Sequence, residues 1–144
     1  MLVSRIFKEK GDRLVTARPD DTIATAAETL KRERIGALMV VDERGELAGI
    51  ISERDIVRAM PEHGPELFGL SVDKLMNREF VTCGPGDRFH EIMKNMTSGR
   101  FRHMPVIDDG KLVGIISIGD VVKSRLQELE TETSQLRDYI VGAG

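Results

Sequence analysis

A short motif that occurs twice constrains this chain more than any other feature. Gly49 to Asp55 reads GIISERD and Gly114 to Asp120 reads GIISIGD, an offset of 65 residues in a chain of 144. Both copies fit within the length of one compact domain, so we expect them to pack against each other as one body. Function is therefore to be sought between the two halves.

The similarity extends upstream of the repeated motif. Val15 to Pro19 corresponds to Val81 to Pro85, and Val40 to Asp42 corresponds to Val106 to Asp108, both at an offset of 66 residues. The offset then falls by one, where ERG in the first copy faces DG in the second. Such a difference is typical of two hairpin turns of unequal length.

Both copies show the same succession of hydrophobic patterns. Apolar residues at three-four spacing predict an amphipathic helix, two apolar runs around a glycine turn predict paired strands, and a serine then begins a second helix. With a short strand near Val15 or Val81, each copy reads β-α-β-β-α, a mixed α/β (α+β) class. The predicted elements are helices at 23–30 and 89–96, strands at 37–41, 47–51, 104–107 and 112–116, and helices beginning at Ser52 and Ser117.

The segments outside these patterns suggest the boundaries. Pro61 to Leu70 holds two prolines and two glycines and is predicted to be a loop. Ser71 is predicted to cap a short helix over 72–76, and residues 3, 6 and 7 predict a helix before the first copy. The resulting division is 1–70 for the first motif with its N-terminal helix and linker, 71–124 for the second motif, and 125–144 for a C-terminal helical tail.

Composition excludes several classes of protein. The chain is 40% apolar and 31% charged, with a net charge of -3 that offers no basic surface for duplex nucleic acid. The one cysteine excludes a disulfide framework. Because no apolar run reaches the roughly 20 residues that span a bilayer, and Met1 to Phe7 is too short for a signal peptide, we expect a cytoplasmic protein without a membrane segment.

Signatures of catalysis are missing as well. The sequence has no G-x-S-x-G, no H-E-x-x-H and no P-loop, and Gly84 to Gly86 lacks the third glycine of a dinucleotide fingerprint. Cys83 has no dedicated base, so we interpret it as a small hydrophobic filler. His63 and His90 show no metal-ligand spacing. We expect neither an enzyme nor a metal site.

The order of elements, the two GIIS motifs and the stretch RFRHMPVID at Arg100 to Asp108 resemble a tandem pair of cystathionine-β-synthase (CBS) motifs, the Bateman module. The resemblance covers roughly residues 1–123. It implies two motifs packed with pseudo-two-fold symmetry into one module, and an adenosine-containing ligand in the cleft between them.

The repeated motif itself has chemistry suited to such a ligand. A serine at a helix start, with an aspartate one turn later, presents a hydroxyl, backbone N–H groups and a carboxylate, which suit a phosphate and a ribose diol. The alternative is a capping box, with Ser52 or Ser117 as the N-cap and Asp55 or Asp120 reaching back. The two roles are compatible.

The resemblance implies two nucleotide sites, each shared between the motifs. One joins Thr16, Ala17, Ile35, Gly36 and Ala37 to Ser117, Gly119 and Asp120. The other joins Val81, Thr82, Cys83, Phe101, Arg102, His103, Met104 and Pro105 to Ser52, Arg54 and Asp55. Since the first copy lacks an equivalent of His103-Met104-Pro105, it brings no basic phosphate ligand, and we expect unequal sites.

Arg100, Arg102 and His103 form a tight basic cluster that suits the phosphates of a nucleotide. A solvated strand entry is the alternative, and for Arg100 alone we favour it. We therefore expect a regulatory sensor that binds AMP or a related adenine nucleotide (ADP, ATP), with NAD(H) also possible, and that signals to an unknown effector protein. The alternatives are an architectural dimerisation module without ligand, and a single-stranded RNA-binding protein, disfavoured by 4% aromatic residues.

The C-terminal run has a heptad pattern. Val122, Leu126, Leu129, Thr133, Leu136 and Ile140 step by four and three residues in alternation. About two and a half repeats are too few to dimerise alone. The run either covers its own domain or contacts a second subunit, and the resembled modules commonly pair, which favours a homodimer.

Overall fold

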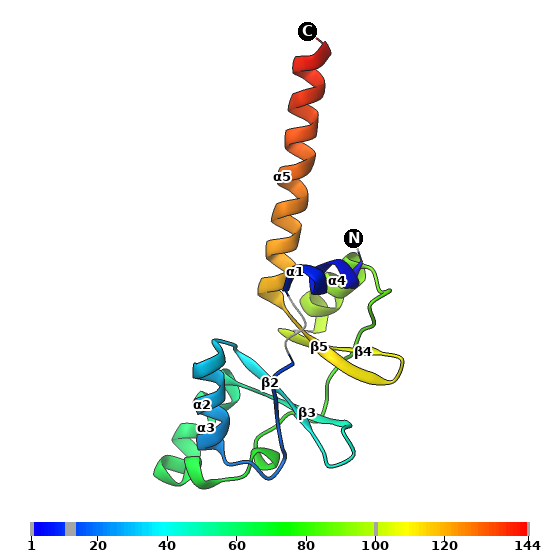
Figure 1. Cartoon of the computed structure of the whole chain (residues 1–144). Helices are drawn as coiled ribbons and strands as arrows, with labels where there is room; N and C mark the ends of the chain where they lie inside the picture. The colour runs from blue at the N-terminus through cyan, green and yellow to red at the C-terminus, as the bar shows by residue number, and fades with distance from the viewer. Residues whose placement is uncertain (1, 11–13, 100, 144) are drawn as a thin grey trace.

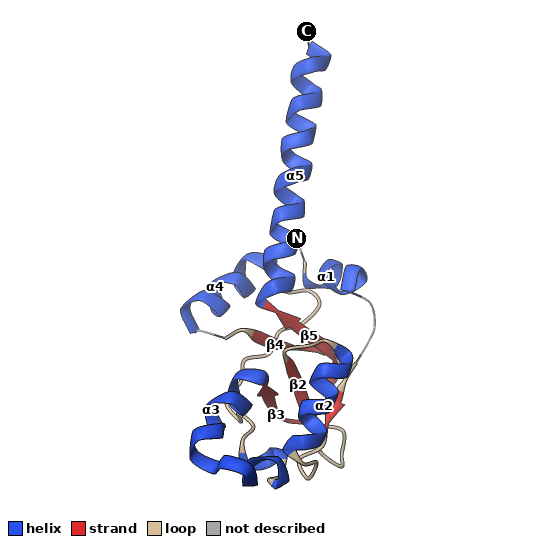
Figure 2. Ribbon diagram, turned by 90° about the vertical axis from the view of Figure 1, so that its left-hand side faces the viewer, coloured by secondary structure: helices blue, strands red, loops and turns tan. Residues whose placement is uncertain are grey.

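The computed structural model describes residues 2–10, 14–99 and 101–143. In Figures 1 and 2 the strands lie in the middle of the body, with α2 and α3 at one end and α1, α4 and the root of α5 at the other. The elements are α1 (Val3–Lys10), β1 (Thr16–Ala17), α2 (Ile23–Glu33), β2 (Ala37–Val41), β3 (Leu47–Ser52), α3 (Glu53–His63), η1 (Gly64–Gly69), η2 (Val72–Lys74), α4 (Phe89–Gly99), β4 (His103–Asp108), β5 (Lys111–Ser117) and α5 (Ile118–Ala143). The mixed α+β fold with two repeated motifs is confirmed.

The two sheets have the same topology, but the first has three strands and the second has two. In the first motif β1 pairs in parallel with β2, where Ala17 lies opposite Val40, and β2 pairs antiparallel with β3. In the second motif β4 and β5 pair antiparallel, and the predicted first strand is reduced to one parallel bridge between Cys83 and Val106. The two parallel contacts are equivalent, because both residues of the pair are shifted by the 66-residue offset.

The hairpin turns account for the one-residue change in offset. In the first hairpin the Asp42 N–H donates to the Glu46 carbonyl at 2.9 Å, and Gly45 has a φ of +81°. In the second, Asp109 and Gly110 have φ values of 52° and 76°. Two successive positive φ values define a two-residue type I′ turn, one residue shorter than the first turn.

Each motif has its own hydrophobic core, and the segment preceding each motif packs into the core of the other half. Val3 and Ile6 of α1 are buried in the second core, whereas Val72 and Met76, which precede the second motif, are buried in the first. Equivalent hydrogen bonds anchor both segments: the Val3 N–H donates to the Asp87 carbonyl at 3.0 Å, and the Val72 N–H donates to the Asp21 carbonyl at 2.7 Å. Chain order assigns α1 to the first motif, but its buried face lies in the second.

The predicted loop over residues 61–70 is wrong. Helix α3 continues through Pro61 to His63, and a 3₁₀ helix follows. Proline has no N–H to donate to the Val57 carbonyl, so the last turn of α3 has one helical hydrogen bond fewer. Leu67 is fully buried in the first core, and this burial orders a segment that its composition marks as a loop.

Ser71 does not cap a helix as predicted. The helix expected over 72–76 is a single 3₁₀ turn, Val72–Lys74, whose N-cap makes no side-chain hydrogen bond. The Ser71 hydroxyl instead bonds the Asp73 carboxylate. Competition of this kind between side chain and backbone is common for serine.

Helix α5 unites the second motif's last helix and the predicted tail into one element of 26 residues. Val121 and Ser124 on its first turns are buried, whereas every residue from Leu129 to Gly142 is exposed. Figure 1 shows the helix projecting from the body. The alternative in which the tail covers its own domain is therefore wrong.

Candidate functional site

A cleft of about 420 Å³ lies between the two motifs. The first motif contributes Gly36, Ile50, Ser52, Glu53, Arg54, Asp55 and Arg58. The segment after η2 contributes Asn77, Glu79 and Phe80, and the second motif further contributes Phe101, Arg102, His103 and Ile118. The cleft thus draws on both halves, as the duplication predicts.

Equivalent backbone hydrogen bonds frame the cleft from both sides. The Glu53 N–H donates to the Gly36 carbonyl at 2.9 Å, and the Ile118 N–H donates to the Arg102 carbonyl at 2.8 Å. Each bond ties the first residue of a helix to the residue just before a strand. Because all four residues line the same cleft, the cleft spans the pseudo-two-fold relation between the motifs.

Gly36 allows the two motifs to approach closely at this point. A Cβ atom on Gly36 would lie 3.6 Å from Nε2 of His103, in van der Waals contact. A larger side chain would compete with the imidazole for space. The absence of a side chain on the first motif thus makes room for a basic side chain from the second.

Ser52 and Asp55 form the predicted capping box at the start of α3. The Asp55 N–H donates to Ser52 Oγ at 3.2 Å, and the Ser52 N–H and hydroxyl both donate to Asp55 Oδ2 at 2.9 Å. The other carboxylate oxygen, Oδ1, has no hydrogen-bond partner among the described residues. The capping network therefore holds the carboxylate in place and leaves one oxygen for a ligand.

The second copy repeats this network at the start of α5. The Ser117 N–H donates to Asp120 Oδ2 at 2.9 Å, and the Asp120 N–H donates to Ser117 Oγ at 3.1 Å. Neither residue lines the cleft around Ser52. Capping is confirmed for both serines, and the ribose-binding role remains a prediction.

Three arginines and a histidine converge on the cleft. Arg54 and Arg58 stand one turn apart on α3, while Arg102 and His103 enter from the second motif. Glu53, Asp55 and Glu79 also line the cleft, so the formal charges of its three arginines and three carboxylates cancel. Arg58 was missed by sequence reasoning, although its spacing of four residues from Arg54 places both on one helix face.

The structure brings together part of the second predicted site. Phe101, Arg102 and His103 line the cleft with Ser52, Arg54 and Asp55, as predicted. The side chains of Cys83, Met104 and Pro105 are buried, so only their backbone could reach a ligand. The other members lie outside the cleft lining: Val81 packs on the second core and Thr82 is exposed.

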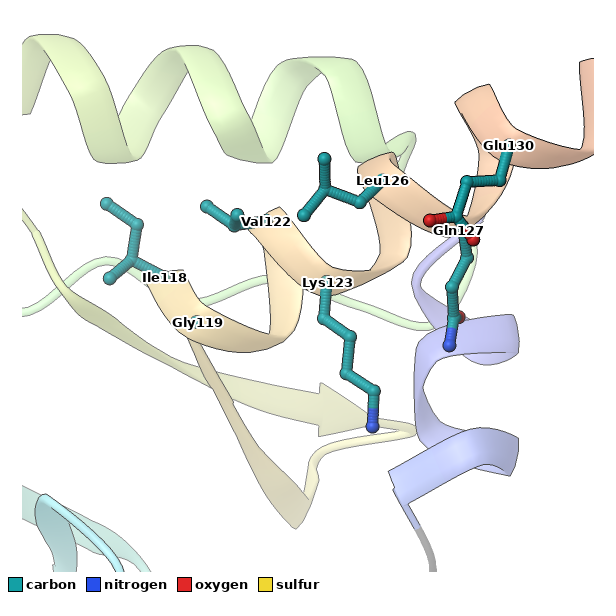
Figure 3. Close-up of a pocket in the computed structure, with 7 residues that line it drawn as sticks. All are labelled: Ile118, Gly119, Val122, Lys123, Leu126, Gln127 and Glu130. Atoms are coloured by element: carbon teal, nitrogen blue, oxygen red, sulfur yellow. The ribbon is translucent and has the colours of Figure 1, made fainter. Parts of the chain in front are cut away.

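The first predicted site is not assembled in this cleft. Gly36 lines it beside Ser52 and His103, although the prediction paired Gly36 with Ser117 and Asp120. Other members are placed elsewhere: Ala17 and Ala37 are buried, Ile35 packs on the first core, Thr16 is exposed, and Gly119 lines a groove on α5 (Figure 3). Ala17 belongs to the first core, and Ala37 begins a strand whose first four residues are all buried. Arg100 lies outside the described residues.

The segment that follows η2 contributes cleft residues that no sequence pattern indicates. Asn77 pairs with Ile50 at the edge of β3 through two backbone hydrogen bonds of 2.8 and 3.0 Å. This approach requires glycine at position 49, because a Cβ there would lie 2.9 Å from the Asn77 carbonyl oxygen. Glu79 and Phe80 then follow into the cleft wall.

Cys83 is a buried filler beside the cleft. Burial, together with the smaller effect of the nearby Asp87 carboxylate, raises the pKa of its thiol to about 12. The Sγ atom lies 3.7 Å from the Pro105 carbonyl oxygen. The thiol therefore stays protonated at neutral pH and is not an activated nucleophile.

Within the described ranges, His, Cys, Asp and Glu side chains do not gather in the groups of three that hold a metal ion. The helices of the same ranges include none with the length and apolar character to cross a membrane.

The repeated fold and the cleft between the two motifs define a tandem CBS module, and comparison with known proteins gives the same result. The CBS domain pattern matches residues 8–62 and 72–126, so the chain belongs to the CBS domain family. It is 35% identical to the CBS domain-containing protein CBSX3, mitochondrial, of Arabidopsis thaliana, over 97% of this chain and 72% of that protein.

Two solved structures extend the comparison. The CBS-domain containing protein ATU1752 from Agrobacterium tumefaciens has a TM-score of 0.83 at 43% identity, covering 87% of this chain and 99% of the other. The CBS domain pair of protein MJ0100 has a TM-score of 0.75 at 29% identity, covering 88% and 98%. That structure is a complex with 5-methylthioadenosine and S-adenosyl-L-methionine.

Proposed function

We propose that this CBS pair is a non-catalytic sensor that binds an adenine nucleotide in the cleft around Ser52 and His103. The observation that carries the proposal is the convergence of Arg54, Arg58 and Arg102 with the Asp55 carboxylate in one cleft. A volume of about 420 Å³ falls within the range of small-molecule sites and suits one mononucleotide.

The proposed roles follow from the chemistry of each group. Asp55 Oδ1 accepts hydrogen bonds from the ribose hydroxyls, since an ionised carboxylate is an acceptor and a diol is a donor pair. Arg102, His103 and Arg54 bind the phosphate with charge-assisted hydrogen bonds. The half-buried rings of Phe80 and Phe101 offer apolar surface to the base.

The guanidinium groups of the cleft narrow the choice of ligand within the adenosyl class. The ligands of MJ0100 support an adenosine moiety. Three guanidinium groups favour an anionic phosphate over the cationic sulfonium of S-adenosylmethionine. AMP is therefore the preferred ligand, with ADP or ATP next, and NAD(H) requires room for its second nucleoside outside the cleft.

Further parts of the proposal concern the whole protein. Any second nucleotide site, at Ser117 and Asp120, is the weaker because Gly36 stands where the second motif has Arg102. The module pairs into a homodimer and transmits ligand binding to an effector protein. Residues 1–70, 71–124 and 125–144 remain the predicted units of this module.

Titration calorimetry with AMP, adenosine, S-adenosylmethionine and a short single-stranded RNA tests the proposal. We expect AMP to bind more tightly than adenosine, and S-adenosylmethionine to bind least among the three small molecules. A ligand at about 100 times its dissociation constant should also add roughly 2.7 kcal/mol to the free energy of unfolding. If neither an adenine compound nor RNA binds, the architectural dimerisation module is favoured. Binding of RNA alone would favour a single-stranded RNA-binding protein.

A further inference from the structure

Helix α5 has an apolar stripe that the described part of this chain leaves uncovered. We call this stripe the α5 seam, and its members are Val122, Leu126, Leu129, Thr133, Leu136 and Ile140. The five apolar members are between 40% and 63% exposed. Large apolar side chains exposed along a whole helix are typical of an interaction surface.

The seam is separate from the face with which α5 packs on its own body. That face carries Val121 and Ser124, which are 1% and 3% exposed. Every residue from Leu129 to Gly142 is exposed, and these fourteen residues extend about 21 Å at 1.5 Å per residue. A helical segment of about this length is only marginally stable alone in water, so a partner would stabilise it.

The residue types along the seam favour two parallel strands. In heptad notation Leu126, Thr133 and Ile140 occupy position a, and Val122, Leu129 and Leu136 occupy position d. Within parallel coiled coils, β-branched residues at a combined with leucine at d favour two strands over three or four. Two of the three a positions and two of the three d positions follow this rule.

The charges beside the seam select the same orientation. In a parallel pair, position g of one helix faces position e of its partner five residues further on. This places Arg125 opposite Glu130 and Glu132 opposite Arg137, so both pairs are attractive. An antiparallel pair that overlaps the whole seam would bring Glu130 beside its own copy and Lys123 beside Arg137, which are like charges.

The seam continues into a groove at the root of the helix. The groove has a volume of about 590 Å³, and Ile118, Val122 and Leu126 line it. Figure 3 shows these three side chains on one side of α5, with Lys123 and Gln127 pointing to another. All residues that line the groove belong to α5, so a second helix along the seam could begin its contact at the first turn of α5.

We propose that α5 pairs with α5 of a second copy of this chain as a parallel, in-register, two-stranded coiled coil. The proposal rests on the homodimer proposed above and specifies its partner surface, orientation and register. Ile118 and Gly119 in the groove at the root extend the contact surface of the two and a half heptads by one turn.

Disulfide cross-linking tests the register. Thr133→Cys places a thiol opposite its own copy in the parallel arrangement, so mild oxidation should give a covalent dimer on a non-reducing gel. Asp138→Cys is the matched control, because position 138 lies on the opposite side of the helix and should not cross-link. The native Cys83 is buried, so the unsubstituted chain should stay uncross-linked. No cross-link at position 133, or equal cross-linking at 138, would overturn the proposal.

Charge reversal tests the orientation. Glu132→Arg and Arg137→Glu each turn two symmetry-related exposed pairs from attraction into repulsion, which should raise the dissociation constant of the dimer on the order of tenfold. Mixing the two variants should restore affinity, because a heterodimer pairs opposite charges at both places. Sedimentation equilibrium measures the dissociation constant of the dimer for each variant and for their mixture. An unchanged dissociation constant in both variants would contradict the parallel arrangement but not the homodimer. A native chain that is monomeric would contradict both the parallel arrangement and the homodimer.

Discussion

The two motifs share one backbone plan but contribute different chemistry to the same cleft. The carbonyls of Gly36 and Arg102 accept equivalent hydrogen bonds from Glu53 and Ile118. At this shared position the first motif has no side chain and the second has a guanidinium group. The difference teaches that a duplication preserves the backbone frame while each copy specialises in the side chains that it places there.

The helices that follow show the complementary difference. Arg54 and Arg58 of α3 line the cleft, whereas Gly119 and Lys123, at the equivalent positions of α5, line the groove at the root of the projecting helix. The first motif therefore presents a charged helix start to a ligand. The second presents a more apolar one, which we assign to self-association.

The largest effect is expected from emptying either core at equivalent positions. Leu38→Ala and Met104→Ala remove side chains that are 0% exposed, and each should lower the free energy of unfolding by about 2 to 5 kcal/mol. If the motifs form one cooperative unit, both variants lower the midpoint of a single calorimetric transition. Val57→Ala, at a position 59% exposed, is the control and should change stability by less than about 0.5 kcal/mol. Two separate transitions would show that the halves unfold independently.

The next effect distinguishes the two repeated aspartates. Asp55→Asn keeps an acceptor for the cap but should weaken AMP binding by about 1.5 to 3 kcal/mol, because Asp55 lines the cleft. Asp120→Asn changes the equivalent residue, which does not line this cleft, and should have little effect on the tighter site. Calorimetric titration of both variants measures the difference. Equal losses would mean that the predicted site at Asp120 contributes to AMP binding as much as the site at Asp55.

Alkaline pH should destabilise the chain through Cys83 of the second core. The pKa of Cys83 is about 12 in the folded chain, above the ordinary cysteine value of 9.0. The unfolded chain therefore loses this proton first, and stability falls as the pH rises from about 9 towards 12, by about 1.4 kcal/mol per pH unit. Cys83→Ala, which installs the residue found at the equivalent Ala17, should remove this component. Urea melts of the native chain and the variant at pH 8 and pH 10 give the change in the free energy of unfolding between the two pH values. An equal change in both proteins would contradict the burial argument.

The smallest effect is expected at the edge of the cleft. Arg58→Ala removes one exposed charge near the proposed phosphate and should weaken AMP binding by about 0.5 to 1 kcal/mol, with no loss for adenosine. Lys123→Ala at the equivalent position should leave AMP binding unchanged. Titration at two salt concentrations checks this, because an electrostatic contact weakens as salt rises. A loss that is equal for adenosine would assign Arg58 a structural role instead.

Sequence patterns predicted the repeated elements well because their signals are local. The three-four spacing of Ile23, Ala26 and Leu30 identified α2, and Ser52 identified the start of α3. The cleft was predicted only in part. Phe101, Arg102 and His103 were recognised because they belong to a motif, whereas Arg58 and Asn77 reach the cleft through packing that no motif records.

The sequence by itself determined the duplication, the order of elements, the capping serines and the basic strand entry, because each depends on neighbours close along the chain. Only the tertiary structure decided that Gly36 faces His103, that α1 packs into the second core and that α5 stands free of its body. These outcomes depend on which apolar surfaces the folded chain buries against each other. That choice is made among segments some 65 residues or more apart, where local patterns no longer constrain it.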